Sequence, residues 1–161
     1  MKWKIEVSYK PETPDAAGRG LLQDIADLGI TGVESVRTAQ IYWIDGDIDA
    51  DAIERICCEL LADAVTQQYV YGESGSPAQT EGSAGPNVWA IEIRFKPGVT
   101  DAVGDSVVKG IRDMGISGVD AAQTGQKYWI HGNLHLPILQ TIAQRLLANE
   151  VIQAFEIRRD A

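Results

Sequence analysis

The chain has 161 residues, a formal net charge of −9 and a pI of about 4.6. So acidic a chain repels phosphate groups, which argues against nucleic acid and anionic membranes as partners. The sequence opens directly into a strand-like alternation without an apolar signal segment, and no apolar run approaches the length of a membrane span. We therefore expect a cytoplasmic protein.

The most informative feature is an internal repeat. The stretch from about Trp3 to Tyr71 recurs from Trp89 to Ile157 at a constant offset and without a gap. A period this long indicates one small domain duplicated, since solenoid repeats are shorter and need at least three copies. Two like domains on one chain commonly replace a symmetric dimer, and a unit of about 70 residues has only a marginal core alone. We therefore expect the two repeats to pack as a pseudo-twofold dimer.

Each repeat begins with a strand and a helix. Residues 3–9 and residues 89–95 alternate between apolar and polar side chains, which predicts a half-buried strand. Asp15 or Asp101 can cap the helix that follows. A glycine then stands where a left-handed helix terminator belongs. These glycines are Gly29 and Gly115, and the predicted buried stripes are Leu21, Leu22, Ile25 and Leu28 in the first copy and Val103, Val107, Val108, Ile111 and Met114 in the second.

The second half of each repeat predicts two strands, a helix and a last strand. The two strands cover 33–38 and 41–45, with a turn at Ala39-Gln40, and their counterparts are 119–124, 127–131 and Gly125-Gln126. Only the second copy has a good turn residue, so one bent strand stays open as the alternative. The helix runs from about 50 to 62, and in the second copy Pro137 lies near its first position. Its predicted inward residues are Ile53, Ile56, Leu60 and Leu61, and the last strands are 69–71 and 155–157.

These elements give each repeat the order β-α-β-β-α-β, an α+β unit of the ferredoxin-like, two-layer kind with two helices over one face of a sheet. The predicted domains are residues 1–71 and 87–161. Residues 72–86 between them are rich in Gly, Ser and Pro, which is typical of a flexible linker. Neighbouring strand residues point to opposite faces, so one aromatic of Tyr42-Trp43 lies away from the helices, where the other repeat is the natural partner.

No group of residues indicates a reaction. Residues 45–51 resemble the start of a calcium loop, but the loop glycine and glutamate are missing, and helix capping explains the acids better. His131 and His135 have the spacing of a zinc pair, but a glycine and a proline interrupt any helix there. Adjacent Cys57 and Cys58 suit neither a disulfide nor a metal, and Cys57 falls on the apolar face, which predicts a buried thiol. The residues favour a non-catalytic module that presents surfaces to partners.

The segment 95–104, Phe-Lys-Pro-Gly-Val-Thr-Asp-Ala-Val-Gly, resembles the PurS family, the small subunit of phosphoribosylformylglycinamidine synthase. That family has Lys-Pro-Gly-Val-x-Asp-Pro-x-Gly before its first helix, a later Val-Arg-x-Gly-Lys segment and a closing Leu-Leu-Ala-Asn-Pro-Val-Ile run. Here the corresponding places hold 122–126 and 146–152, followed by Phe155-Glu156-Ile157. The likeness spans the whole second repeat and extends to the first in weaker form. Both copies have Gln, at Gln40 and Gln126, where the family has Lys.

The resemblance implies a function in purine biosynthesis. PurS-like proteins have no active site; they assemble as dimers and bridge a PurL-like synthetase to a PurQ-like glutaminase. The complex uses ATP, Mg and glutamine, none of which this chain is expected to bind, and ammonia must pass between its subunits. A tandem chain would be a PurS dimer with joined subunits, either as a separate protein or as the front of a longer synthetase. Whether this pseudo-dimer pairs again as a further homodimer stays open. The residues that the resemblance places at the partner interface are Lys96, Pro97, Asp101, Gly125, Gln126 and Asn149.

Two further interpretations compete with the assembly subunit. Paired ferredoxin-like domains often hold small metabolites at their interface, so a ligand-binding regulatory module has the same element order. An enzyme in its own right is the third interpretation, and the missing acid–base or metal cluster argues against it. The two repeats have also diverged, which suggests that each faces a different partner. On this hypothesis, changes at Lys96 or Asp101 weaken complex formation more than changes at Lys10 or Asp15.

Overall fold

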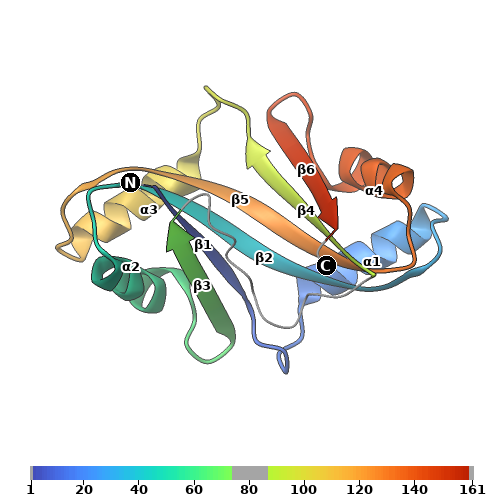
Figure 1. Ribbon diagram of the computed structural model, residues 1–161, viewed down its shortest axis with the longest axis horizontal. Coiled ribbons are helices and arrows are strands. Elements are labelled where there is room, and N and C mark those ends of the chain that lie inside the picture. Colours follow the sequence, from blue (N-terminus) through green and yellow to red (C-terminus); the bar gives the residue numbers. More distant parts are fainter. Residues whose placement is uncertain (1, 74–86, 160–161) are drawn as a thin grey trace. The chain divides into compact units, whose positions relative to one another are not determined.

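Strands and helices alternate through residues 2–73 and 87–159, the part of the chain that the computed structural model describes (Figure 1). The strands of this part are β1 (Lys2–Tyr9), β2 (Val33–Gly46), β3 (Gln67–Glu73), β4 (Val88–Phe95), β5 (Val119–Gly132) and β6 (Gln153–Arg159). Its helices are α1 (Ala16–Asp27), α2 (Ala50–Ile56), α3 (Ala102–Asp113) and α4 (Leu136–Ile142), with the π-helical turns η1 (Cys57–Leu61) and η2 (Ala143–Leu147). The strand order is β3-β1-β2-β5-β4-β6, which confirms the predicted α+β class.

The chain divides into two compact units that do not follow the repeats. The first unit comprises the described residues of Met1–Thr13, Gln40–Thr80 and Thr100–Gly125, and the second comprises those of Pro14–Ala39, Glu81–Val99 and Gln126–Ala161. Each unit therefore contains a helix from the other repeat: α3 belongs to the first unit and α1 to the second. The predicted boundaries 1–71, 72–86 and 87–161 describe the duplication in sequence and stay a prediction, as does the pseudo-twofold packing. Gly72 and Glu73 belong to β3, and the rest of the predicted linker lies outside the described residues.

The core of the first unit lies between its strands and the helices α2 and α3. Apolar side chains of β1 meet those of both helices, and all of them are buried. The contributing residues are Trp3, Ile5 and Val7 of β1, Ile44 of β2, Ile53 and Ile56 of α2, Val107 and Ile111 of α3, and Val119 and Ala122 of β5. The apolar side chains of residues 3–9 alternate along β1, and those of α3 follow helical spacing. The two sets pack in one core, although they come from different repeats.

The second unit has the corresponding core. Its helices are α1 and α4, and its central residues are buried. They are Leu21 and Ile25 of α1, Val36 of β2, Ile91 and Ile93 of β4, Ile130 of β5, Leu139 and Ile142 of α4, and Ala143 of η2. The apolar stripe of α1 therefore packs on strands of the second repeat, just as the stripe of α3 packs on strands of the first.

No turn interrupts β2 or β5, so the predicted turns at Ala39-Gln40 and Gly125-Gln126 are wrong, and the long-strand alternative holds. Gly125 is not among the glycines with positive φ, which a tight hairpin turn requires. Around the predicted turns the side chains continue to alternate between the two faces of the strands. Tyr42 packs against the first core and Tyr128 against the second, whereas Trp129 packs with Ala39 in a separate small cluster. One aromatic of each Tyr-Trp pair faces away from the helices, as predicted.

Both helices that precede the edge strands end in a π-helical turn instead of continuing as α-helix. The Ala62 N–H bonds the Cys57 carbonyl at 3.0 Å and the Ala148 N–H bonds the Ala143 carbonyl at 2.9 Å. Leu61 in the first turn and Leu146 and Leu147 in the second are partly buried and pack against the cores. Leu60, predicted to face inward, is 39 % exposed.

Two other members of the predicted stripes lie outside the core. Leu28 is 37 % exposed at the C-cap of α1, where the helix ends, and Val103 is 55 % exposed in the first turn of α3. Exposed apolar residues are common on protein surfaces, so these two positions need no further explanation. The glycine terminators are confirmed, because Gly29 and Gly115 both have φ of 83°.

Candidate functional site

The six residues predicted to form a partner interface belong to two different compact units. The boundary between the units falls inside the Lys-Pro-Gly-Val-Thr-Asp motif, between Val99 and Thr100. Asp101 and Gly125 belong to the first unit, and Lys96, Pro97, Gln126 and Asn149 belong to the second. The predicted residues of each unit are therefore described separately.

Three of the six lie on two neighbouring turns of the second unit. Lys96 and Pro97 begin the turn after β4, and Asn149 begins the turn before β6. The Lys96 N–H donates to the Ile152 carbonyl at 2.8 Å, which joins the two turns. The side chain of Asn149 accepts from the Val151 N–H at 3.1 Å, an Asx turn that fixes the second loop. We call residues 96–99 and 149–152 the second turn pair; in Figure 1 they are the loop after β4 and the loop before β6.

The first unit repeats this arrangement in residues 10–13 and 63–66, the first turn pair. The Lys10 N–H donates to the Thr66 carbonyl at 2.9 Å, and the Lys10 ammonium donates to the Ala64 carbonyl at 2.9 Å. Asp63 replaces Asn149 and accepts from the Val65 N–H at 2.8 Å. The backbone geometry is thus preserved in both copies, whereas the side chains on it differ.

Both turn pairs carry an exposed valine at the same repeat position. Val65 is 79 % exposed and Val151 is 82 % exposed, and Ile152 beside Val151 is 37 % exposed. An Asx turn needs its carboxylate or amide but does not need a β-branched residue two positions later. Single exposed apolar residues are common, but the same exposed valine on two equivalent turns beside a lysine is a surface feature. Sequence reasoning missed both valines, although the repeat itself, Asp-Ala-Val and Asn-Glu-Val, carried the signal.

Asp101 has a structural role, and its place at a partner interface stays a prediction. It caps α3 by accepting from the Gly104 N–H at 2.8 Å, and it also accepts from the N–H and the hydroxyl of Thr124, at 2.6 and 3.0 Å. Asp15 does the same for α1, with Gly18 and Thr38 as donors. Both predicted helix caps are confirmed. The contacts with β5 and β2 tie each helix to the unit in which it packs.

Gln126 and Gly125 lie in the middle of β5. The Gln126 side chain is exposed and accepts from the Tyr128 hydroxyl at 2.5 Å, which holds it along its own strand. Burial raises the pKa of the Tyr128 hydroxyl. Neither residue lies in a turn pair.

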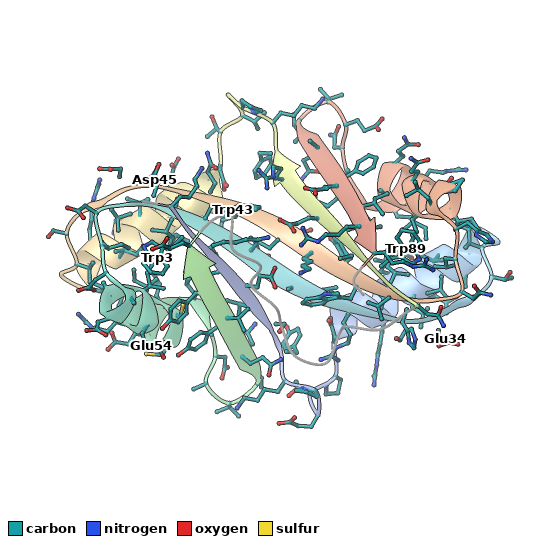
Figure 2. The ribbon with its side chains drawn as sticks, in the orientation of Figure 1. Trp3, Glu34, Trp43, Asp45, Glu54 and Trp89 are labelled. Carbon is teal, nitrogen blue, oxygen red and sulfur yellow. The ribbon has the colours of Figure 1, made fainter. Side chains whose placement is uncertain are left out.

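The first unit has a polar cluster that the second lacks. Tyr69 donates to the carboxylate of Glu54, which Figure 2 labels on α2, and the rings of Tyr69 and Tyr71 stack with centroids 6.4 Å apart. Hydrogen bonds from both tyrosines lower the pKa of Glu54, and the same bonds raise the pKa of Tyr69 and Tyr71. The corresponding residues of the second repeat are Gln140, Phe155 and Ile157. The two units therefore present different chemistry beside their edge strands.

Buried acids on the strands are paired locally. Glu92 is 5 % exposed and accepts from Arg158 at 2.8 Å, and the side chain of Glu6 lies 3.7 Å from the Lys4 ammonium. Charged groups that are buried need such partners. These pairs give the buried carboxylates of β1 and β4 charged partners.

The acidic segment, the two histidines and Cys57 were the other candidates from the sequence. Asp49 caps α2 by accepting from the Ala52 N–H at 2.9 Å, so the helix-capping interpretation of the acidic segment is confirmed. His131 lies 3.4 Å from Glu34, and His135 precedes α4. Cys57 is buried, as predicted, and burial raises the pKa of its thiol to about 12.

Within residues 2–73 and 87–159, no group of three or more His, Cys, Asp or Glu is placed to hold a metal ion. No helix in the same residues is long and apolar enough to cross a membrane.

Comparison with known proteins identifies the family. The family model PurS, described as phosphoribosylformylglycinamidine (FGAM) synthase, matches residues 2–73 and again residues 88–161. No curated protein sequence matches the chain. The two matches cover both repeats, which confirms the tandem duplication read from the sequence. The chain belongs to the PurS family, in a form that carries two PurS segments, and so belongs with FGAM synthase of purine biosynthesis.

Proposed function

We propose that this chain is the non-catalytic assembly subunit of FGAM synthase in the cytoplasm, where it bridges a PurL-like synthetase and a PurQ-like glutaminase. The observation that carries the proposal is the repeated turn pair in a chain with two PurS segments. ATP, Mg and glutamine are then used by the partners, and this chain contributes surfaces. Two linked segments provide two such surfaces on one molecule.

The turn pairs have the properties of docking sites. Each presents an exposed valine on a loop whose backbone is fixed by hydrogen bonds, so little conformational entropy is lost when a partner binds there. Burying a valine that is about four-fifths exposed contributes roughly 1–2 kcal/mol to binding. Rigid, apolar projections of this kind are suited to a pocket on a partner protein.

The two turn pairs are suited to different partners. In the first, the Lys10 ammonium bonds the Ala64 carbonyl of its own unit. In the second, the Lys96 side chain is exposed, and within the described residues no hydrogen bond or ion pair involves its ammonium. The second turn pair therefore offers a charge to an acidic group of a partner, together with Val151 and Ile152. This difference supports the hypothesis that each repeat faces a different subunit.

Reconstitution tests the proposal. The chain is mixed with a PurL-like synthetase and a PurQ-like glutaminase, and glutamine-dependent amidine formation is measured with and without it. We expect a ternary complex on size-exclusion chromatography and glutamine-dependent activity only when all three proteins are present. Failure to form a complex at about micromolar concentrations, the usual range for assembly contacts, contradicts the proposal. A thermal shift with amino acids or nucleotides, without partner binding, supports the metabolite-binding module instead.

Variants at the turn tips make the test specific. Val151→Asp and Val65→Asp should each weaken one partner contact by about tenfold, because each puts a charge into an apolar contact. Val103→Asp is the matched control: this valine is 55 % exposed on α3, outside both turn pairs, and its replacement should leave the complex intact. Equal loss in all three variants would contradict docking through the turns.

A further inference from the structure

The edge strand β3 of the first unit has main-chain groups directed outward in a regular pattern. β3 pairs with β1 in antiparallel register, with Val70 opposite Glu6, and β3 is the terminal strand of its sheet. The Lys10 N–H bonds the Thr66 carbonyl in the same register, so alternate residues from Thr66 onward (Gln68, Val70 and Gly72) exchange bonds with β1. The N–H and C=O groups of Tyr69, Tyr71 and Glu73 are therefore the ones that point away from β1.

The sequence of β3 lacks the usual protection of an edge strand. Exposed edges are normally blunted by charges, proline or bulges. From Gln67 to Tyr71 the strand has no charged residue and no proline, and its only charge is Glu73 at the end. The equivalent edge strand β6 of the second unit carries Glu156, Arg158 and Arg159. The edge at β3 therefore permits another strand to bind, whereas the charges on β6 oppose it.

β3 is also complementary to itself. In an antiparallel pair of two β3 strands centred on Val70, Tyr69 of one copy lies opposite Tyr71 of the other, and Glu73 lies opposite Gln67. This register forms about six main-chain hydrogen bonds and puts aromatic residues opposite one another, a favourable cross-strand pair. No like charges meet. The same pairing of two β6 strands would put Glu156 directly opposite Glu156, which is unfavourable.

We propose that β3 is a homodimerisation edge: two copies of this chain pair through β3 in antiparallel register about a twofold axis at Val70. The interface is isologous, so it closes as a dimer and does not propagate into fibres. One strand buries little surface, so the dimer is weak, with a dissociation constant on the order of micromolar. The net charge of −9 on each copy opposes association, so added salt strengthens it.

Sedimentation equilibrium on the whole chain tests this, with a matched pair of substitutions. We expect the average mass to rise with concentration towards twice the 17.5 kDa of one chain. Glu73→Pro removes an outward N–H without removing a bond to β1, a position where an edge strand tolerates proline. It should raise the dissociation constant about tenfold, since two intermolecular bonds are lost across the twofold axis. Arg159→Pro, the same change at the equivalent position of β6, should have no effect.

Amide hydrogen exchange identifies the strand. The N–H groups of Tyr69 and Tyr71 should become protected as the protein concentration rises, whereas those of Phe155 and Ile157 in β6 should not change. A chain that stays monomeric up to about millimolar concentration, where contacts of this size still associate, overturns the proposal. So does equal weakening by Glu73→Pro and Arg159→Pro. If the chain is monomeric alone but Val70→Lys abolishes binding to the synthetase, β3 binds a partner strand, and the homodimer is wrong.

Discussion

Replacing Asp101 by alanine separates a structural role from a docking role. The carboxylate accepts hydrogen bonds from the Gly104 N–H, the Thr124 N–H and the Thr124 hydroxyl, at 2.6 to 3.0 Å. The Asp101→Ala variant leaves these donors without their partner, and Thr124 is 5 % exposed, so water replaces the carboxylate poorly there. We expect a large loss of stability, since Asp101 joins α3 to β5.

The magnitude follows from the three bonds. Loss of an N-cap side chain costs about 1 kcal/mol of unfolding free energy, and each donor left unsatisfied on a buried residue adds roughly 1 kcal/mol. The sum is about 3 kcal/mol. For a chain of this length, 1 kcal/mol corresponds to about 2–4 °C in the midpoint of thermal unfolding, so the midpoint should fall by roughly 6–12 °C.

The assay is thermal and urea unfolding followed by circular dichroism, with two controls. Asp105→Ala removes an acid from the first turn of the same helix and should cost only about 0.5 kcal/mol of dipole interaction. Asp101→Asn keeps one acceptor oxygen and should fall between the two. If Asp101→Ala changes stability no more than Asp105→Ala but abolishes binding to a partner subunit, Asp101 is a docking residue and the reasoning is refuted.

Three further predictions use other contacts. Gly104→Ala should destabilise the protein by about 2 kcal/mol or more, because the added Cβ would lie 2.2 Å from the Ala122 carbonyl oxygen. Gly20→Ala is the control: nothing lies within 4 Å of its Cβ, so it should stabilise α1 by roughly 0.5–1 kcal/mol. Chemical denaturation measures both changes. In an alkaline spectroscopic titration, Glu54→Gln should bring the raised pKa of Tyr69 back towards 10.0. A raised pKa of Tyr69 in the fold contributes stability that is lost as the pH rises through it, so the variant should lose less stability at alkaline pH. An unchanged titration contradicts this. A thiol reagent at neutral pH should modify one of the two cysteines in the native protein, and reaction of Cys57 before unfolding would show that its burial is wrong.

Local chemistry made several features predictable. Asp15 and Asp101 cap helices and Gly29 and Gly115 end them because side-chain acceptors and permitted φ values act over a few residues. The candidate site was harder to predict. The family motifs point to Lys96 and Asn149. They do not point to the exposed valine between Asn149 and β6, because periodicity locates buried residues and does not identify a single apolar residue in a turn.

The repeat in the sequence determined the duplication, the α+β class, the family and which face of each element is apolar. Only the tertiary structure decided which apolar faces meet. The stripes of α1 and α3 are equivalent copies, so each fits the strands of either repeat equally well by pattern, and hydrophobic burial has no direction that favours one. The unbroken strands β2 and β5 decide the matter: since no turn forms at Gln40 or Gly125, each strand runs on from one compact unit into the other, and each repeat contributes a helix to the core of its neighbour.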